Sequence, residues 1–147
     1  KAVLVDPEFD AAAGSMVCAP VEWMVGVIRT LQVPLADQQL LDAILVALTV
    51  MRQRPFYPPD VNGWPHGHAW LSTISTAARV WAAEKFSRLG NLAVVEDAAP
   101  TDRVDAVGYL IGVGAWTDRT AAVLADLADD PPRLVAAAVN SPEYLTV

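Results

Sequence analysis

Prolines divide this chain into segments whose apolar residues recur with helical spacing. Proline fixes φ and lacks a backbone N–H, so it suits the first turn of a helix and breaks a helix interior. Pro20 and Pro131 stand where apolar residues begin to recur every three or four positions, and Pro34 and Pro55 stand where that recurrence ends. No segment shows a convincing alternation of apolar and polar residues. The sequence therefore predicts an all-α fold, a helical bundle of about six helices.

The ends of the expected helices carry capping residues. Asp37, Thr101, Asp130 and either Thr117 or Asp118 precede apolar periodic segments, where a side-chain oxygen can accept from free backbone N–H groups. Asp6 before Pro7 has the same form, as do Ser141 and Pro142 near the other end. The helices are expected at about 20–31, 37–53, 70–89, 102–116, 118–128 and from 131 onward, with a last turn at 141–144.

Three expectations concern packing. Glycines 108, 112 and 114 on the fourth helix favour the close approach of another helix. Residues 92–95 could form a short strand, although the sequence offers no second strand to pair with it. The second and third helices should each bury one apolar face, formed by Leu41, Ile44, Leu45, Leu48 and Met51 in the second, and by Leu71, Ile74, Ala78, Trp81, Ala82 and Phe86 in the third.

Composition bounds the class of protein. The 147 residues fit one helical domain, yet 54% of them are hydrophobic and the mean hydropathy is +0.32, which is apolar for a small domain. We therefore expect either self-association or membership of a larger folded unit, and a first residue Lys1 rather than Met favours the second. A net charge of −7 without a basic stripe argues against nucleic-acid binding. No run approaches the roughly 18 apolar residues of a membrane span.

One long ordered loop separates the second and third helices. Residues 56–70 combine prolines, glycines, two tryptophans and both histidines. Proline and glycine together specify an unusual backbone shape, and shaped loops on helical scaffolds often carry function. This Pro/Gly/Trp-rich loop is therefore the expected candidate site.

Six loop residues are candidates for ligand binding: Asp60, Asn62, Trp64, His66, His68 and Trp70. The two tryptophans could stack on a sugar while Asp60 and Asn62 bond its hydroxyls, but anchoring of the loop on the helices is favoured, with Asp60 and Asn62 bonding their own backbone. His66 and His68 could donate two nitrogens to a metal, yet a tight zinc site wants three or four ligands, so solvated histidines are favoured and no metal is expected.

The cysteine and the acidic residues outside the loop form no recognisable catalytic or metal-binding pattern. Cys18 is the only cysteine, which excludes an intrachain disulfide, and it is expected to be a small buried side chain. The acidic clusters near residues 97–105 and 126–130 look like helix caps and a solvated face rather than an acid–base pair. No catalytic residue and no cofactor are predicted.

The loop resembles a family hallmark. Its sequence Pro58-Pro59-Asp60-Val61-Asn62-Gly63-Trp64-Pro65-x-Gly67-x-Ala69-Trp70 is similar to the Pro-Pro-Asn/Asp-Val-x-Gly-Trp-x-x-Gly-x-x-Trp loop of the bacterial domain-of-unknown-function family numbered 1800. Pro20-Val21-Glu22 with Arg29-Thr30-Leu31, Ser141-Pro142-Glu143-Tyr144 and Asp6-Pro7-Glu8-Phe9 also resemble that family's helix and Pro-Glu-aromatic motifs. His66 and His68 depart from its usual residues, which weakens the metal hypothesis further.

The resemblance implies a context rather than an activity. Members of the family are much longer, so this chain would be the C-terminal part of such a protein. They are often exported, and their genes frequently lie beside those of sulfatase-like exported proteins, which implies an extracytoplasmic or cell-envelope location.

Two hypotheses for function follow. The first is a non-catalytic structural or protein-interaction module of an exported protein, docking against the missing N-terminal part of its own chain or against a partner protein, with homo-oligomerisation left open. The alternative is an enzyme or carbohydrate-binding domain that uses the loop at residues 58–70 as its pocket.

Overall fold

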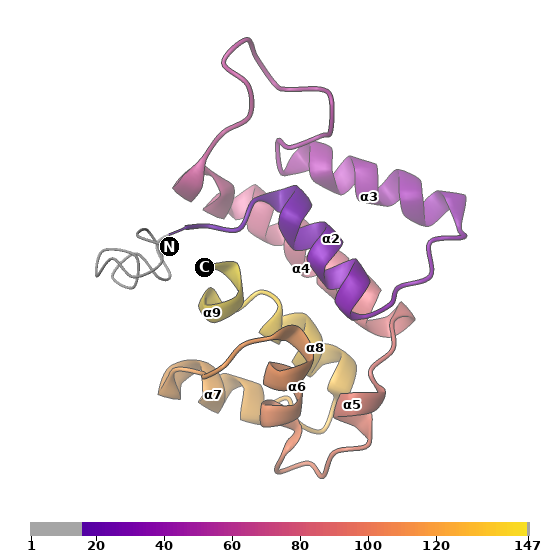
Figure 1. The fold of residues 1–147 in the computed structure, drawn as a ribbon, viewed down its shortest axis with the longest axis vertical. Helices are drawn as coiled ribbons and strands as arrows, with labels where there is room; N and C mark the ends of the chain where they lie inside the picture. The colour runs from indigo at the N-terminus through magenta and orange to yellow at the C-terminus, as the bar shows by residue number, and fades with distance from the viewer. Residues whose placement is uncertain (1–15, 147) are drawn as a thin grey trace, which may run out of the picture.

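The all-α prediction is confirmed by a computed structural model, which describes residues 16–146. Within these residues the helices are α2 (Pro20–Thr30), α3 (Gln38–Val50), α4 (Thr73–Leu89), α5 (Ala93–Glu96), α6 (Arg103–Ile111), α7 (Asp118–Ala125), α8 (Pro131–Ala138) and α9 (Pro142–Leu145). A 3-10 helix, η2 (Gly67–Leu71), precedes α4. Figure 1 shows α4 running behind α2, with α3 and the long loop at one end and α5 to α9 at the other.

Side-chain caps start several helices where the sequence placed them. Asp37, Thr117, Asp130 and Ser141 each accept a hydrogen bond from a backbone N–H in the first turn of α3, α7, α8 and α9. The predicted cap at Thr101 is wrong, because α6 begins after Asp102, whose side chain makes no capping bond. The expected helix start at Asp6 lies outside the described residues.

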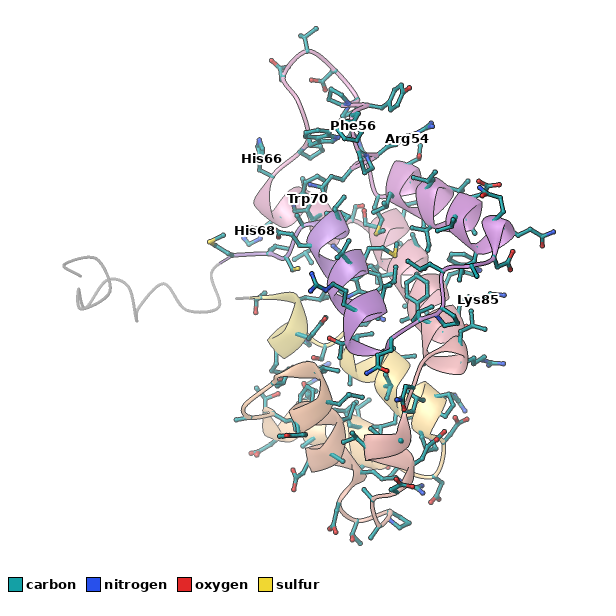
Figure 2. All side chains as sticks on the ribbon, turned by 45° about the vertical axis from the view of Figure 1, so that its right-hand side comes forward. Arg54, Phe56, His66, His68, Trp70 and Lys85 are labelled. Carbon is teal, nitrogen blue, oxygen red and sulfur yellow. The ribbon has the colours of Figure 1, made fainter. Side chains whose placement is uncertain are left out.

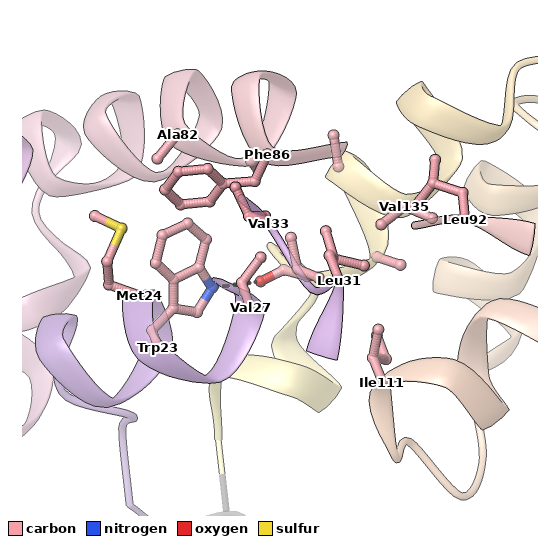
Figure 3. Packing of buried hydrophobic residues seen from close by; sticks show 14 of the residues in the cluster. Trp23, Met24, Val27, Leu31, Val33, Ala82, Phe86, Leu92, Ile111 and Val135 are labelled. Atoms are coloured by element: carbon pink, nitrogen blue, oxygen red, sulfur yellow. Dashed lines mark hydrogen bonds between the residues drawn. The ribbon is translucent and has the colours of Figure 1, made fainter. Parts of the chain in front are cut away.

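Helix α4 is the centre of the core. It packs against α8, α3 and α2, and its residues Ala82, Ala83 and Phe86 are fully buried. Figure 3 shows the Trp23 indole of α2 beside Phe86 and Ala82. The indole N–H donates to the Val139 carbonyl at 2.7 Å, which ties α2 to the end of α8 and satisfies the one polar atom of that ring.

Three boundaries differ from the sequence prediction. The expected third helix is divided at Ser72, which is extended and caps α4. Residues 93–96 form one helical turn rather than a strand, because Asn91 Oδ1 accepts from the Ala93 N–H at 3.0 Å. The expected fourth helix stops at Ile111, because Gly112 takes a left-handed conformation with φ of 79°.

The predicted helix–helix contact at the fourth-helix glycines is also wrong. Gly112 and Gly114 lie beyond α6, and Gly108 is approached by Trp116 from the chain that follows, so that a Cβ on Gly108 would lie 3.1 Å from Trp116 Nε1. The Trp116 indole N–H donates to the Val104 carbonyl at 3.2 Å. A folded-back tryptophan therefore fills the space expected for a second helix.

The predicted apolar faces of α3 and α4 are only partly buried. Ile44, Leu48 and Met51 are in the core as expected, whereas Leu45, Ile74 and Trp81 are exposed. These helices are apolar on more than one side, and helical spacing alone does not say which side meets a neighbour. No helix between residues 16 and 146 has both the length and the hydrophobicity needed to cross a bilayer.

Candidate functional site

The loop between α3 and η2 has a defined backbone. Arg52 and Phe56 both have positive φ, 62° and 63°, and the Tyr57 N–H donates to the Arg54 carbonyl at 3.2 Å. Farther along, Asp60 makes its own turn: its Oδ1 accepts from the Asn62 N–H at 2.8 Å and its carbonyl accepts from the Gly63 N–H at 3.1 Å. The loop projects beyond the helices (Figure 1) and holds its shape through these local bonds.

The two loop tryptophans lie at the base of the loop. Trp70 in η2 is buried, and its carbonyl accepts from Arg79 Nη1 at 2.9 Å. Trp64 is half-buried, and its indole N–H donates to the Arg54 carbonyl at 3.3 Å. A buried ring offers no face to a sugar, so a stacking platform would rest on Trp64 alone, which lines a cleft with Val21, Gln53, Pro55 and Phe56.

The two histidines differ from the tryptophans in that both are exposed to solvent. His66 precedes η2, His68 lies within it, and both are exposed, as Figure 2 shows at the side of the loop. Across the part of the chain that the structure describes, no three His, Cys, Asp or Glu side chains are gathered as metal ligands. Since Asp60 is engaged in its turn, the structure does not assemble the six candidate residues around one cleft, and their role in ligand binding stays a prediction.

The loop also presents apolar side chains to solvent. Phe56 and Tyr57 are exposed, and Val61 is fully exposed. The Arg54 guanidinium lies over the Tyr57 ring, 4.7 Å from its centroid, and Figure 2 shows Arg54 and Phe56 directed outward together. Sequence reasoning concentrated on Trp64 and Trp70 and missed these three residues, although two aromatics directly before a Pro-Pro pair could have indicated them.

A second apolar surface lies beside the loop, between α3 and α4. It is a groove of about 430 Å³, here called the α3–α4 groove. Its walls include the exposed side chains Val46, Ile74 and Trp81. Alanines supply much of the rest, so the full lining is Ala43, Val46, Ala47, Val50, Ile74, Ala77, Ala78 and Trp81.

The Ser-Pro-Glu-Tyr segment at residues 141–144 has a structural role. Glu143 of α9 accepts from the Thr117 N–H at 3.1 Å, from the Thr117 hydroxyl at 2.8 Å and from the Thr120 hydroxyl at 3.1 Å. Burial raises the pKa of this carboxyl, but hydrogen bonding from the backbone of Glu143 itself and from Thr117 and Thr120 outweighs burial and lowers its pKa to about 2. Glu143 therefore fastens α9 to the start of α7.

Cys18 has the character of a packing residue. It is half-buried, and its backbone N–H donates to the Leu145 carbonyl at 2.8 Å. Burial and the charge of Glu22 raise the pKa of the thiol, while Arg79 opposes that change. A raised pKa keeps the thiol protonated at neutral pH, which is the opposite of what a nucleophile needs.

Comparison with known protein families adds one match. The family described as "Protein of unknown function (DUF1800)" matches residues 1–146, almost the entire sequence. The chain belongs to this family. No curated protein and no solved structure matches it. The family description assigns no activity, so the function of this DUF1800 member has to be argued from its own geometry.

Proposed function

We propose that this chain is a non-catalytic helical module that binds another polypeptide segment. The observation that supports this proposal is the α3–α4 groove, an apolar surface left open by helices whose opposite faces are packed in the core. Exposed apolar grooves of this kind are typical of protein–protein contact sites.

The shape of the groove favours an amphipathic helix as its occupant. Alanines 43, 47, 77 and 78 leave the space between α3 and α4 shallow and wide, while Val46 and Trp81 supply bulk around it. A helix that lays one apolar face into such a groove buries its i, i+3, i+4 and i+7 side chains. The groove has almost no polar lining, so the facing side chains should be aliphatic or aromatic.

Three exposed side chains of the loop supply a second contact. Phe56, Tyr57 and Val61 are exposed, and the base of the loop is fixed by Trp70 and by the hydrogen bond of Trp64. A loop that already has its shape loses less conformational entropy on binding. We infer that these three loop side chains and the α3–α4 groove take part in the same interaction.

We propose that the occupant is a preceding helix of a longer polypeptide, of which this chain is the C-terminal part, or else a helix of a partner protein. The mean hydropathy of +0.32 supports an occupant of either origin, since the chain carries more apolar residues than one small core requires. We also propose an extracytoplasmic or cell-envelope location, on the basis of family resemblance.

An environment-sensitive apolar dye, 8-anilinonaphthalene-1-sulfonate, tests whether the groove is an open binding surface. We expect the chain to enhance the fluorescence of the dye and the substitution Val46→Asp to remove most of that enhancement. The control is Val25→Asp on α2, because Val25 is also an exposed helical valine, 46% exposed against 62% for Val46, and is not among the residues that line the groove. Equal loss in both variants, or no enhancement by the unsubstituted chain, would count against the proposal. Light scattering on the same samples shows whether a second copy occupies the groove.

A further inference from the structure

Helix α3 has an outer side as well as the side that packs on α4. Ile44 and Leu48 are buried, whereas Leu45 is 42% exposed and Val46 is 62% exposed. A shallow depression of about 240 Å³ lies on the outer side and is here called the α3 outer strip. Its lining residues are Asp42, Leu45, Val46, Thr49 and Arg54.

The order of these residues along the chain gives the strip two oppositely charged ends. Asp42 lies in the second turn of α3, and Arg54 lies beyond the last residue of the helix, Val50. Both charged residues are exposed, and Figure 2 shows Arg54 at the loop end of α3. An acid and a base are therefore separated by an apolar middle.

The middle of the strip can be buried without leaving a polar group unpaired. Leu45 and Val46 are aliphatic. The hydroxyl of Thr49 donates to the Leu45 carbonyl at 2.7 Å, so it already has a partner within the helix. Burying such a surface against another protein removes apolar area from water and does not cost an unsatisfied hydrogen bond.

The two charged ends keep the capacity to bond a partner. Asp42 Oδ1 accepts from Gln38 Nε2 at 2.9 Å, and a carboxylate can accept further hydrogen bonds on both of its oxygens. The Arg54 guanidinium lies over the Tyr57 ring, with its central carbon 4.7 Å from the ring centroid. Stacking uses the face of a guanidinium, whereas its N–H donors lie in the plane and can still meet a carboxylate.

We propose that the α3 outer strip binds the same strip of a second copy of this chain, with the two α3 helices antiparallel across a two-fold axis. The axis places Asp42 of each copy opposite Arg54 of the other and brings the two apolar middles together. A parallel pair would place like charges together, and a partner of uniform charge would be attracted at one end and repelled at the other. The charges of the strip therefore favour a second copy in the antiparallel arrangement.

This inference goes beyond the function proposed for the α3–α4 groove. Val46 lines both surfaces, whereas Ile74 and Trp81 line the groove and are not among the residues of the strip. Substitutions on α4 can therefore test the groove, and substitutions of the two charged residues can test the strip, each without changing the other surface.

Charge reversal in the whole chain tests the pairing, with the dimer dissociation constant measured by sedimentation equilibrium. Since only five residues line the strip, the dimer should be weak, and protein concentrations up to about 1 mM are needed. Asp42→Arg and Arg54→Asp should each weaken association by about tenfold or more, because both opposite-charge pairs of the dimer become like-charge pairs. The controls Asp129→Arg and Arg133→Asp make the same changes of net charge at exposed positions outside the strip and should leave association unchanged.

An equimolar mixture of the two strip variants gives the sharpest result. In a mixed dimer the Asp42→Arg chain supplies two arginines and the Arg54→Asp chain supplies two aspartates, so both pairs become attractive again. Association should return to within about threefold of the parent value, and this recovery also shows that each variant is folded. Ile74→Asp, which changes the groove and not the strip, should leave association unchanged.

The proposal fails if the unsubstituted chain stays monomeric at about 1 mM, if the single variants associate as tightly as the parent, or if their mixture stays monomeric. None of these results would count against the function proposed for the groove. Loss of association in Ile74→Asp, with none in the charge variants, would overturn the proposal in another way, because it would assign the self-contact to the groove.

Discussion

The two faces of α4 have similar chemistry and opposite surroundings. On the inner face Phe86 is completely buried, together with Ala82 and Ala83, against α2 and α8. On the outer face Trp81 is 45% exposed and Ile74 is 60% exposed, over the α3–α4 groove. Both faces are apolar, so hydrophobicity alone does not distinguish the core of this module from its proposed interaction surface.

The difference lies in what each face has available to bury it. The inner face meets α2, which precedes α4 in the chain, and α8, which follows it (Figure 1). The outer face meets only α3, whose small side chains leave the groove open. An apolar face that its own fold does not cover remains free to bury the surface of another polypeptide.

Alanine substitutions on the two faces of α4 should give the largest difference in stability. Phe86→Ala should lower the free energy of unfolding by about 3–5 kcal/mol, because it leaves a cavity in a closed core. Trp81→Ala should lower it by roughly half as much, since 45% of the surface of that residue is already in water. Urea denaturation followed by circular dichroism measures both, and equal losses would mean that the outer face contributes to the core.

The close packing at the end of α4 gives a second test of the contrast between the closed core and the open groove. A Cβ on Gly90 would lie 2.7 Å from both the Cβ and the carbonyl oxygen of Leu31, and the neighbouring Asn91 N–H donates to that carbonyl at 2.6 Å. Gly90→Ala should therefore cost about 1–3 kcal/mol through overpacking. The control is Ala77→Val in the open groove, which should be nearly neutral by the same denaturation assay.

Acid should weaken the contact between α9 and the start of α7 in a defined range of pH. The pKa of Glu143 is lowered from 4.5 to about 2, so its carboxylate stabilises the fold above about pH 4.5, and that stabilisation is lost as the pH falls toward 2. At neutral pH, Glu143→Gln should cost about 1 kcal/mol or less, because the side chain is only partly buried and solvent screens its interactions. Unfolding measured at several pH values should show the two proteins converging near pH 2. A difference that is constant with pH would contradict the role given to the carboxylate.

Zinc should produce the smallest effect. His66 and His68 are exposed, and no third ligand is gathered beside them in the described part of the chain. Adding stoichiometric zinc should leave the melting temperature unchanged, and His68→Ala should behave as the parent does. A rise in melting temperature that His68→Ala abolishes would restore the metal hypothesis for the loop.

Local signals in the sequence predicted where helices begin better than they predicted which helices pack together. Asp37, Asp130 and Ser141 cap the helices expected of them because capping depends only on residues within one turn. Gly112 ended a helix that was expected to continue, since apolar spacing past it resembled more helix. The loop was recognised, and the anchoring of Trp70 agrees with the favoured interpretation.

The open groove could not be derived in the same way. Ile74 and Trp81 fit a helical stripe with Phe86, yet they lie on the opposite side of α4 from the core. Which stripe is covered depends on where α8 returns, a long-range contact that periodicity does not encode. Arg79 was likewise missed, because one arginine in a helix looks like a solvent-facing residue until the packing around it is known.

The central claim is that the α3–α4 groove holds a helix of another polypeptide segment. The most direct measurement places a photo-crosslinking benzoylphenylalanine at Val46, or at the control position Val25 on α2, in the protein expressed in its native cells. After irradiation, mass spectrometry identifies the attached peptides. The account predicts one dominant adduct at position 46, on an amphipathic helix of the same polypeptide or of a partner, and none of comparable yield at position 25. The same diffuse adducts at both positions would contradict it.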